Sequence, residues 1–123
     1  MYEVGLSVSF HASHSLRGYF GPAQQVHEHD YRVDVVAIGP TLNDDGVLLD
    51  IVLIESAIRD ITEQWNGRCL DDLPELMDVN TTVEALSAYL HKHLRTQFPE
   101  AGPTSLEVRV WESPTAWGAY RDI

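Results

Sequence analysis

The sequence is poor in cysteine, in positive charge and in long apolar runs, and each scarcity excludes a class of protein. Cys69 is the only cysteine, so the chain cannot form an internal disulfide. Eight Lys and Arg residues against nineteen Asp and Glu residues give a formal net charge of −11, which repels phosphate backbones and anionic lipids. We therefore expect no nucleic-acid partner and no membrane partner. Because the sequence has neither a membrane-length apolar run nor an apolar leader, we also expect a cytoplasmic protein.

The 123 residues contain no internal repeat, low-complexity tract or linker, which indicates a single domain over residues 1–123. A chain of this length buries roughly two thirds of its unfolded surface on folding and needs no disulfide for stability. Its Gly and Pro residues fall between periodic segments, in the order strand, loop, strand, helix, helix, strand.

Two segments alternate apolar and polar residues as half-buried strands do. In Tyr2–His14 the even positions are apolar, which places His14 on the buried face. In residues 27–37 the odd positions form the apolar face, and His27 and His29 belong to it. Three imidazoles are therefore expected to point toward the interior, two from one strand and one from another.

This arrangement is typical of a three-histidine zinc site with an open fourth position. A buried histidine is more often hydrogen-bonded within the core than bound to a metal. Three such residues together would need three separate partners, however, whereas one divalent ion satisfies all of them. We therefore favour Zn²⁺ held by His14, His27 and His29. For a phosphorylated ligand, the metal and residues such as Arg17 would have to offset the acidic charge of the chain.

Two amphipathic helices are predicted in the second half of the chain. The first follows Asp50, a candidate N-cap, and carries a stripe of apolar residues spaced three and four apart: Ile51, Ile54, Ile58, Ile61 and Trp65. The second begins at a capping box formed by Thr81 and Glu84. His91 and His93 lie on the second helix about 200° apart, so they cannot share a metal and we expect both to be solvated.

The last predicted strand, residues 105–112, carries a carboxylate on its apolar face. The apolar residues of this strand alternate, and Glu112 falls in the same phase. A carboxylate at a buried position needs a partner. Two roles for Glu112 are open: an ion pair with Arg109 or Arg121, or an interaction with the N–H groups of a ligand ring.

Short motifs follow one another along nearly the whole chain. Phe10–His14 has the form F-x-A-x-H, and His27–His29 has the form H-x-H with Glu28 at its centre. The later motifs are Leu49-Asp50-Ile51, Leu70-Asp71-Asp72-Leu73-Pro74, Asn80-Thr81-Thr82-Val83-Glu84, and Val110-Trp111-Glu112-Ser113 followed by Tyr120-Arg121. In this order they resemble the 6-pyruvoyl-tetrahydropterin synthase family, which includes the 6-carboxytetrahydropterin synthases of the queuosine route. The family's corresponding motifs are F-x-A-x-H, H-G-H, an aspartate before the first helix, L-N-D-x-P, N-P-T-x-E and a terminal strand with a glutamate.

The resemblance implies an α+β tunnelling fold, in which a four-stranded antiparallel sheet carries two helices on one face. It also implies that the sheets of several subunits join into a β-barrel, usually as a hexamer of two stacked trimers, with sites between subunits. The family's zinc ligands correspond to His14, His27 and His29, and its pterin anchor to Glu112. We expect Thr82 and Arg17 to bind the small-molecule substrate as well.

The chain departs from the family at all three of its acid–base positions. The family's catalytic cysteine corresponds to Ala23, and an ungapped run from Asp50 to Pro74 places its Asp-His pair at Asn66 and Gly67. A register shifted by a few residues would place that pair at Asp71 and Asp72 instead, but the L-x-D-x-P match favours the ungapped run. None of these side chains can transfer a proton at neutral pH. A replacement would have to come from elsewhere, and the candidates are Tyr19, Gln24 and Gln25 on the loop before the second strand, Cys69, Asp71 and Asp72.

Three functions are compatible with these residues. The first is a zinc-dependent lyase-type enzyme of this family that acts on a dihydropterin side chain with altered acid–base residues. The second is a diverged paralogue in secondary metabolism that uses zinc for cyclisation, dehydration or retro-aldol cleavage of a non-pterin substrate, which the tryptophans Trp111 and Trp117 favour slightly. The third is a non-catalytic, zinc-stabilised oligomer that binds a ligand.

Overall fold

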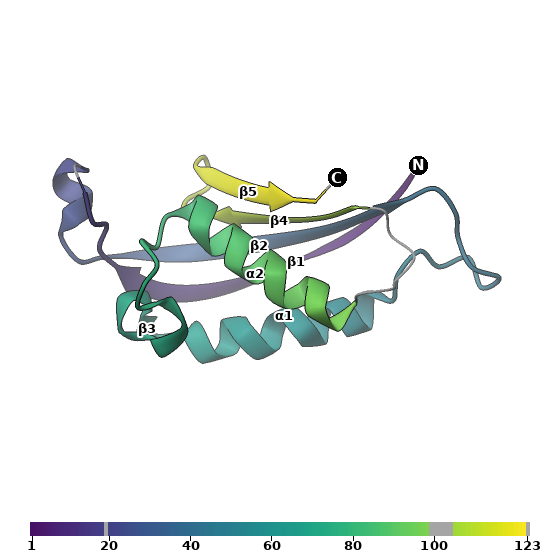
Figure 1. Ribbon diagram of the computed structural model, residues 1–123, viewed down its shortest axis with the longest axis horizontal. Coiled ribbons are helices and arrows are strands. Elements are labelled where there is room, and N and C mark those ends of the chain that lie inside the picture. Colours follow the sequence, from purple (N-terminus) through teal and green to yellow (C-terminus); the bar gives the residue numbers. More distant parts are fainter. Residues whose placement is uncertain (19, 99–104, 123) are drawn as a thin grey trace.

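The computed structural model describes residues 1–18, 20–98 and 105–122 of the chain. Its strands are β1 (Tyr2–His14), β2 (His27–Gly39), β3 (Arg68–Cys69), β4 (Ser105–Trp111) and β5 (Trp117–Arg121). Its α-helices are α1 (Ile51–Trp65) and α2 (Val83–Gln97), and its short 3₁₀ helices are η1 (Gly21–Gln24), η2 (Leu70–Asp72) and η3 (Pro74–Leu76). The two α-helices run across the same face of the sheet (Figure 1). The expected α+β architecture is confirmed.

The strands form one sheet in the order β3-β1-β2-β4-β5. The pairs β1–β2, β2–β4 and β4–β5 are antiparallel, whereas β3 runs parallel to β1. The register between β1 and β2 pairs Tyr2 with Gly39 at one end and His14 with His27 at the other. The predicted strand over residues 2–14 and its inward-facing His14 are therefore confirmed.

The sheet contains a short fifth strand that the expectation of four strands did not include. β3 consists of two residues that pair with Ala12 and Ser13 of β1. The turn that follows α1 is hydrogen-bonded to β1 just before β3 begins. The backbone N–H of His11 donates to Asn66 Oδ1 at 2.8 Å, and the backbone N–H of Gly67 donates to the carbonyl oxygen of His11 at 2.7 Å. These bonds leave the next residues beside the edge of the sheet.

The core lies between the sheet and the two helices. The buried even-numbered residues of β1 and odd-numbered residues of β2 meet the apolar stripes of α1 and α2, as their spacing predicts. The predicted stripe on α1 is wrong at Ile51, which is 42% exposed because it lies at the start of the helix. Ile54, Ile58 and Trp65 of α1 are almost completely buried. α1 begins at the predicted N-cap, where the carboxylate of Asp50 accepts the backbone N–H of Val52 at 2.9 Å.

Two expectations about α2 are wrong. Its N-cap is Thr82, whose side-chain oxygen accepts the backbone N–H three residues later, and not Thr81. His91 is buried, with 6% of its surface exposed, and its Nε2 lies 3.3 Å from Oδ2 of Asp122. Asp122 follows β5, so this contact depends on where β5 pairs in the sheet. The spacing of residues along α2 gives no information on that pairing. His93 is exposed, as expected.

Within the described ranges, no helix combines the length and the apolar character that crossing a bilayer requires.

Candidate metal centre

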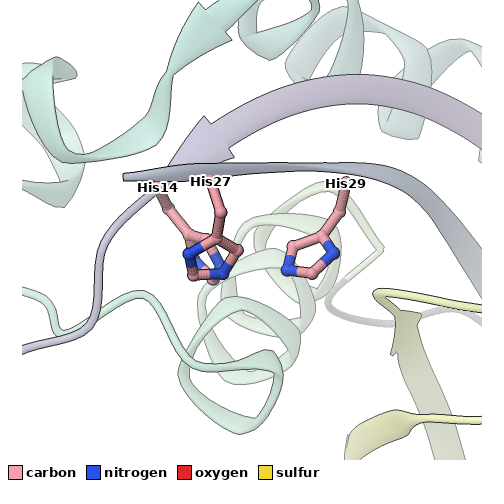
Figure 2. Close-up of side chains that lie close together, drawn as sticks. All are labelled: His14, His27 and His29. Atoms are coloured by element: carbon pink, nitrogen blue, oxygen red, sulfur yellow. The ribbon is translucent and has the colours of Figure 1, made fainter. Parts of the chain in front are cut away.

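Three imidazoles converge where β1 ends and β2 begins. The antiparallel register places His14 directly opposite His27, and His29 lies two residues further along the same face of β2. Their ring centroids are 4.5 Å (His14 to His27), 5.1 Å (His14 to His29) and 4.8 Å (His27 to His29) apart. One nitrogen from each ring can be chosen so that all three lie within 4.8 Å of one another. Figure 2 shows the three side chains leaving the strands on the same side of the sheet.

The hydrogen bonds of two of these histidines determine which ring nitrogen is protonated. Nδ1 of His14 lies 2.9 Å from the carbonyl oxygen of Thr81, and Nδ1 of His27 lies 2.7 Å from that of Gln25. A carbonyl oxygen only accepts, so Nδ1 carries the hydrogen in both rings. When these rings are neutral, Nε2 of each has a free lone pair, which is the form that binds a metal.

Two ring nitrogens of the cluster lack hydrogen-bond partners. In the described part of the chain, Nε2 of His14 and Nε2 of His29 are buried without one. An unpartnered buried nitrogen is costly, and a divalent cation among the three rings would remove that cost. Three neutral imidazoles are also the donor set that Zn²⁺ accepts in sites with an open position. The residues present therefore fit the metal that the sequence predicts.

The surroundings of His14 and His29 favour their neutral rings. Burial lowers the pKa of His14 below its usual value of 6.5, and the neighbouring rings of His27 and His29 lower it further. Burial also lowers the pKa of His29, the charge of Glu112 opposes this shift, and the neighbouring His27 adds to it. Neutral imidazoles keep the lone pairs that a metal needs.

The carboxylate of Asp71 is linked to His14 through the side chain of Thr81. Asp71 Oδ1 accepts the hydroxyl of Thr81 at 2.9 Å, and Thr81 Oγ1 in turn lies 3.2 Å from Nδ1 of His14. Asp71 Oδ2 accepts the backbone N–H of Ser15 at 2.7 Å and its hydroxyl at 3.1 Å. Sequence reasoning named Asp71 as a proton-transfer candidate and missed the contact between Thr81 and His14. Nothing in the spacing of these residues signals that contact.

Glu112 lies beside the histidines. Its Oε2 is 3.6 Å from Nε2 of His29, and its side chain is 32% exposed. Arg109, one of the two arginines considered for it, instead approaches Glu107, with an N–O distance of 3.4 Å. In the described chain Glu112 forms no ion pair with Arg109 or Arg121, which leaves its carboxylate available on the side of the histidine cluster.

The two other candidate substrate-binding residues have different surroundings. Thr82 caps α2 through its side-chain oxygen. The backbone of Arg17 is held by the side chain of Asn80, which accepts its N–H at 2.8 Å and donates to its carbonyl at 2.9 Å. Arg17 is exposed and lines a hollow of about 190 Å³ together with Ser15, Asp71, Met77 and Val79. The structure therefore places Arg17 and Asp71 around one small hollow.

The candidates for proton transfer differ in their surroundings. Cys69 is half-buried in β3 beside Ser13, and Asp72 is exposed at the end of η2. Asp71 already accepts three hydrogen bonds. Tyr19 lies outside the described residues.

The positions at which the family carries its acid–base residues have structural roles here. Ala23 lies in η1, where its carbonyl oxygen accepts the backbone N–H of Leu16 at 2.9 Å. Asn66 uses its side chain to bind the backbone of His11, and Gly67 has a positive φ of 76°. A carboxylate and an imidazole at these two positions would have to fit a turn that an amide and a glycine now form.

Comparison with known proteins agrees with this fold. The sequence profile described as 6-pyruvoyl tetrahydropterin synthase matches residues 3–122. The 6-pyruvoyl tetrahydrobiopterin synthase of Dictyostelium discoideum is 26% identical over 104 residues, which cover 83% of this chain and 75% of that protein. The 6-carboxy-5,6,7,8-tetrahydropterin synthase of Bacillus subtilis is 24% identical over 126 residues, covering 98% of this chain and 85% of that protein.

Solved structures show the same fold at low sequence identity. The 6-pyruvoyl tetrahydropterin synthase of Caenorhabditis elegans superposes with a TM-score of 0.83 at 19% identity, over 99% of this chain and 96% of that one. The enzyme of the same name from Plasmodium vivax gives a TM-score of 0.78 at 18% identity, over 99% of both chains.

Proposed function

The chain belongs to the 6-pyruvoyl tetrahydropterin synthase family, and we propose that it is a zinc-dependent lyase-type enzyme that acts on the side chain of a dihydropterin. One observation carries the zinc requirement: His14 and His29 each bury an unpartnered Nε2 in a three-histidine cluster. The metal ligands in this proposal are His14, His27 and His29. Family membership carries the substrate class, since both curated relatives are named as pterin synthases.

Glu112 is the residue that we assign to the pterin ring. Its carboxylate accepts hydrogen bonds only, so it matches the N–H groups of a pterin ring. Its position 3.6 Å from His29 would hold the ring beside the metal ligands. When bound, Zn²⁺ would act as a Lewis acid toward oxygens of the substrate side chain. Thr82 and Arg17 are proposed as further substrate contacts, with Arg17 supplying positive charge for a phosphorylated side chain.

Proton transfer in this proposal depends on residues other than those of the family. The three hydrogen bonds that Asp71 accepts favour a holding role over proton transfer for its carboxylate. Tyr19, Asp72 and Cys69 are therefore the candidates that we retain for moving a proton.

We also propose that the working form is a cytoplasmic homo-oligomer, a hexamer of two trimers whose sheets join into a barrel. The sheet supports this because much of it lacks a partner in a single chain. β3 covers β1 only at Ala12 and Ser13, which leaves most of that edge unpaired among the described residues. A neighbouring subunit would satisfy such an edge.

A non-catalytic role is the second candidate, and one observation favours it. The side chains of Ala23, Asn66 and Gly67 cannot replace the family's proton-transfer residues. These three positions instead support backbone hydrogen bonds and a turn. Zinc and Glu112 would then retain a ligand without converting it, or the pocket would serve a different, non-pterin substrate.

Incubation of the zinc-loaded protein with 7,8-dihydroneopterin triphosphate, with products followed by mass spectrometry, tests the proposal. The proposed enzyme releases a product with an altered side chain, and the His27→Ala variant releases none because it lacks a metal ligand. An Ala23→Cys variant run in parallel shows whether a thiol at the family's position increases turnover. Binding without product by the unsubstituted chain would favour the non-catalytic role, and no binding would favour a different substrate.

A further inference from the structure

Asp71, Thr81 and His14 form a continuous chain of hydrogen bonds that ends at the metal-binding cluster. The distance from Asp71 Oδ1 to Thr81 Oγ1 is 2.9 Å, and from Thr81 Oγ1 to His14 Nδ1 it is 3.2 Å. The carbonyl oxygen of Thr81 lies at 2.9 Å from the same Nδ1. Thr81 therefore contacts Nδ1 of His14, the ring nitrogen away from the cluster centre, with both its backbone carbonyl and its hydroxyl.

The direction of each hydrogen bond follows from the donors available. An ionised carboxylate only accepts, so the hydroxyl hydrogen of Thr81 points to Asp71. The oxygen of that hydroxyl then presents a lone pair to His14, and Nδ1–H of His14 is shared between it and the carbonyl oxygen of Thr81. The negative charge of Asp71 thus supports a hydrogen bond that fixes the hydrogen of His14 on Nδ1.

Water is excluded from the part of this hydrogen-bonded series that joins Thr81 to His14. The side chains of His14 and Thr81 are completely buried, and Asp71 is half-buried. Asp71 also holds Ser15, the residue after His14, through two further hydrogen bonds. One carboxylate therefore constrains both the backbone that follows His14 and the ring itself.

His14 differs in this respect from His27. Nδ1 of His27 contacts the carbonyl oxygen of Gln25, and no carboxylate extends that contact in the described part of the chain. The carboxylate near His29 lies on the Nε2 side of that ring, at 3.6 Å. Among the three histidines, only His14 has an Nδ1 that is linked to a carboxylate by hydrogen bonds in the described part of the chain.

We infer that Thr81 and Asp71 are positioning residues of the metal centre, which hold the ring of His14 with Nδ1 protonated and Nε2 directed at Zn²⁺. This inference rests on the proposed function, because it assumes that the histidine cluster binds zinc. Residues that hydrogen-bond to a metal-ligating histidine typically change metal affinity about 10–100-fold when they are replaced. Neither residue touches the metal or the substrate in this role.

The test compares zinc affinity in Thr81→Val, Thr81→Ser and the unsubstituted protein, measured by competition with a chromophoric chelator. Valine keeps the shape and the backbone carbonyl of residue 81 but removes the hydroxyl, so zinc affinity should fall about 10–100-fold. Serine restores the hydroxyl and should recover most of the loss. The absorption spectrum of the Co²⁺-substituted protein should change in Thr81→Val and return in Thr81→Ser, because it reports the ligand geometry.

Thr62→Val is the matched control. Thr62 is a buried threonine of α1 whose hydroxyl donates to the carbonyl oxygen of Ile58 at 3.1 Å, away from the histidines. It should lower the melting temperature of the metal-free protein without changing zinc affinity. An Asp71→Asn variant, combined with Thr81→Val, should show non-additive losses because the two residues act on His14 as one unit.

The outcomes separate this inference from the function on which it rests. If the unsubstituted protein binds zinc and Thr81→Val binds it within about twofold, the positioning role is overturned while the zinc proposal stands. An equal loss in Thr62→Val would also overturn it, since general destabilisation would then explain the effect. Failure of the unsubstituted protein to bind zinc would overturn both.

Discussion

Oε2 of Glu112, the residue that follows β4, lies 3.6 Å from Nε2 of His29, a nitrogen of the candidate metal site. A ligand that Glu112 holds would therefore lie against the same atoms that bind the metal. Glu112→Gln should weaken dihydropterin binding about 10–100-fold, because a charge-assisted hydrogen bond contributes about 1.5–3 kcal/mol. Zinc content should be unchanged. Isothermal titration calorimetry with a dihydropterin, alongside metal analysis, measures both quantities.

Glu107→Gln is the control for this prediction. Glu107 lies in β4, on the strand face opposite to the buried residues, where it approaches Arg109. Its substitution should leave dihydropterin affinity intact. Equal affinity of Glu112→Gln and the unsubstituted protein would contradict the role assigned to Glu112.

His11 should titrate above the usual histidine value. Its hydrogen bond to Asp30, at 2.8 Å, raises the pKa of His11 above 6.5, and the charges of Asp30 and Glu28 add to the effect. A raised pKa means that the stabilisation from this pair is complete below pH 6.5 and is lost as the pH rises through the folded-state pKa. Two-dimensional NMR of the imidazole resonances gives the midpoint directly. In Asp30→Asn that midpoint should return toward 6.5, and a midpoint at or below 6.5 in the unsubstituted protein would refute the assignment.

Replacement of Gly67 should destabilise the protein even though there is room for a side chain at this position. Gly67 has a φ of 76°, and no heavy atom lies within 4 Å of a Cβ built on it. The cost of Gly67→His is therefore a backbone cost, about 1–2 kcal/mol in the free energy of unfolding. Gly67→Asn should cost less, because asparagine tolerates this backbone region.

Urea denaturation of the two Gly67 variants makes the comparison. Equal stability of Gly67→His and the unsubstituted protein would show that the turn adapts without strain. The result also bears on function, since it measures how costly it is to restore the histidine that the family carries at this position.

The periodic parts of the fold could be predicted from the sequence. Alternation along Tyr2–His14 gave the correct strand and the correct face for His14, because the side-chain period of a strand is fixed by its geometry. The same argument placed His27 and His29, and the stripe on α1 placed Ile54, Ile58 and Trp65 in the core. These elements are specified by local spacing, which a single sequence contains.

Features that depend on pairing between distant segments could not be predicted in this way. The contact of His91 with Asp122 requires β5 to lie beside α2, and the burial of His91 follows from it. The hydrogen bond from Thr81 to Asp71 joins the segment before α2 to the short helix η2, and neither is long enough to show a period. The capping box at Thr81 was wrong by one residue, because the neighbouring Thr82 has the same capping chemistry and is the N-cap in the structure.

The zinc content of the purified protein, measured beside that of two histidine variants, tests the central claim most directly. The unsubstituted protein should hold about one Zn²⁺ per chain after zinc loading, and His27→Ala should hold almost none because three imidazoles are needed for a catalytic-type site. His93→Ala should keep its zinc, since His93 is an exposed residue of α2 outside the cluster. Zinc content that is the same in His27→Ala as in the unsubstituted protein would contradict the assignment of His14, His27 and His29 as the metal ligands.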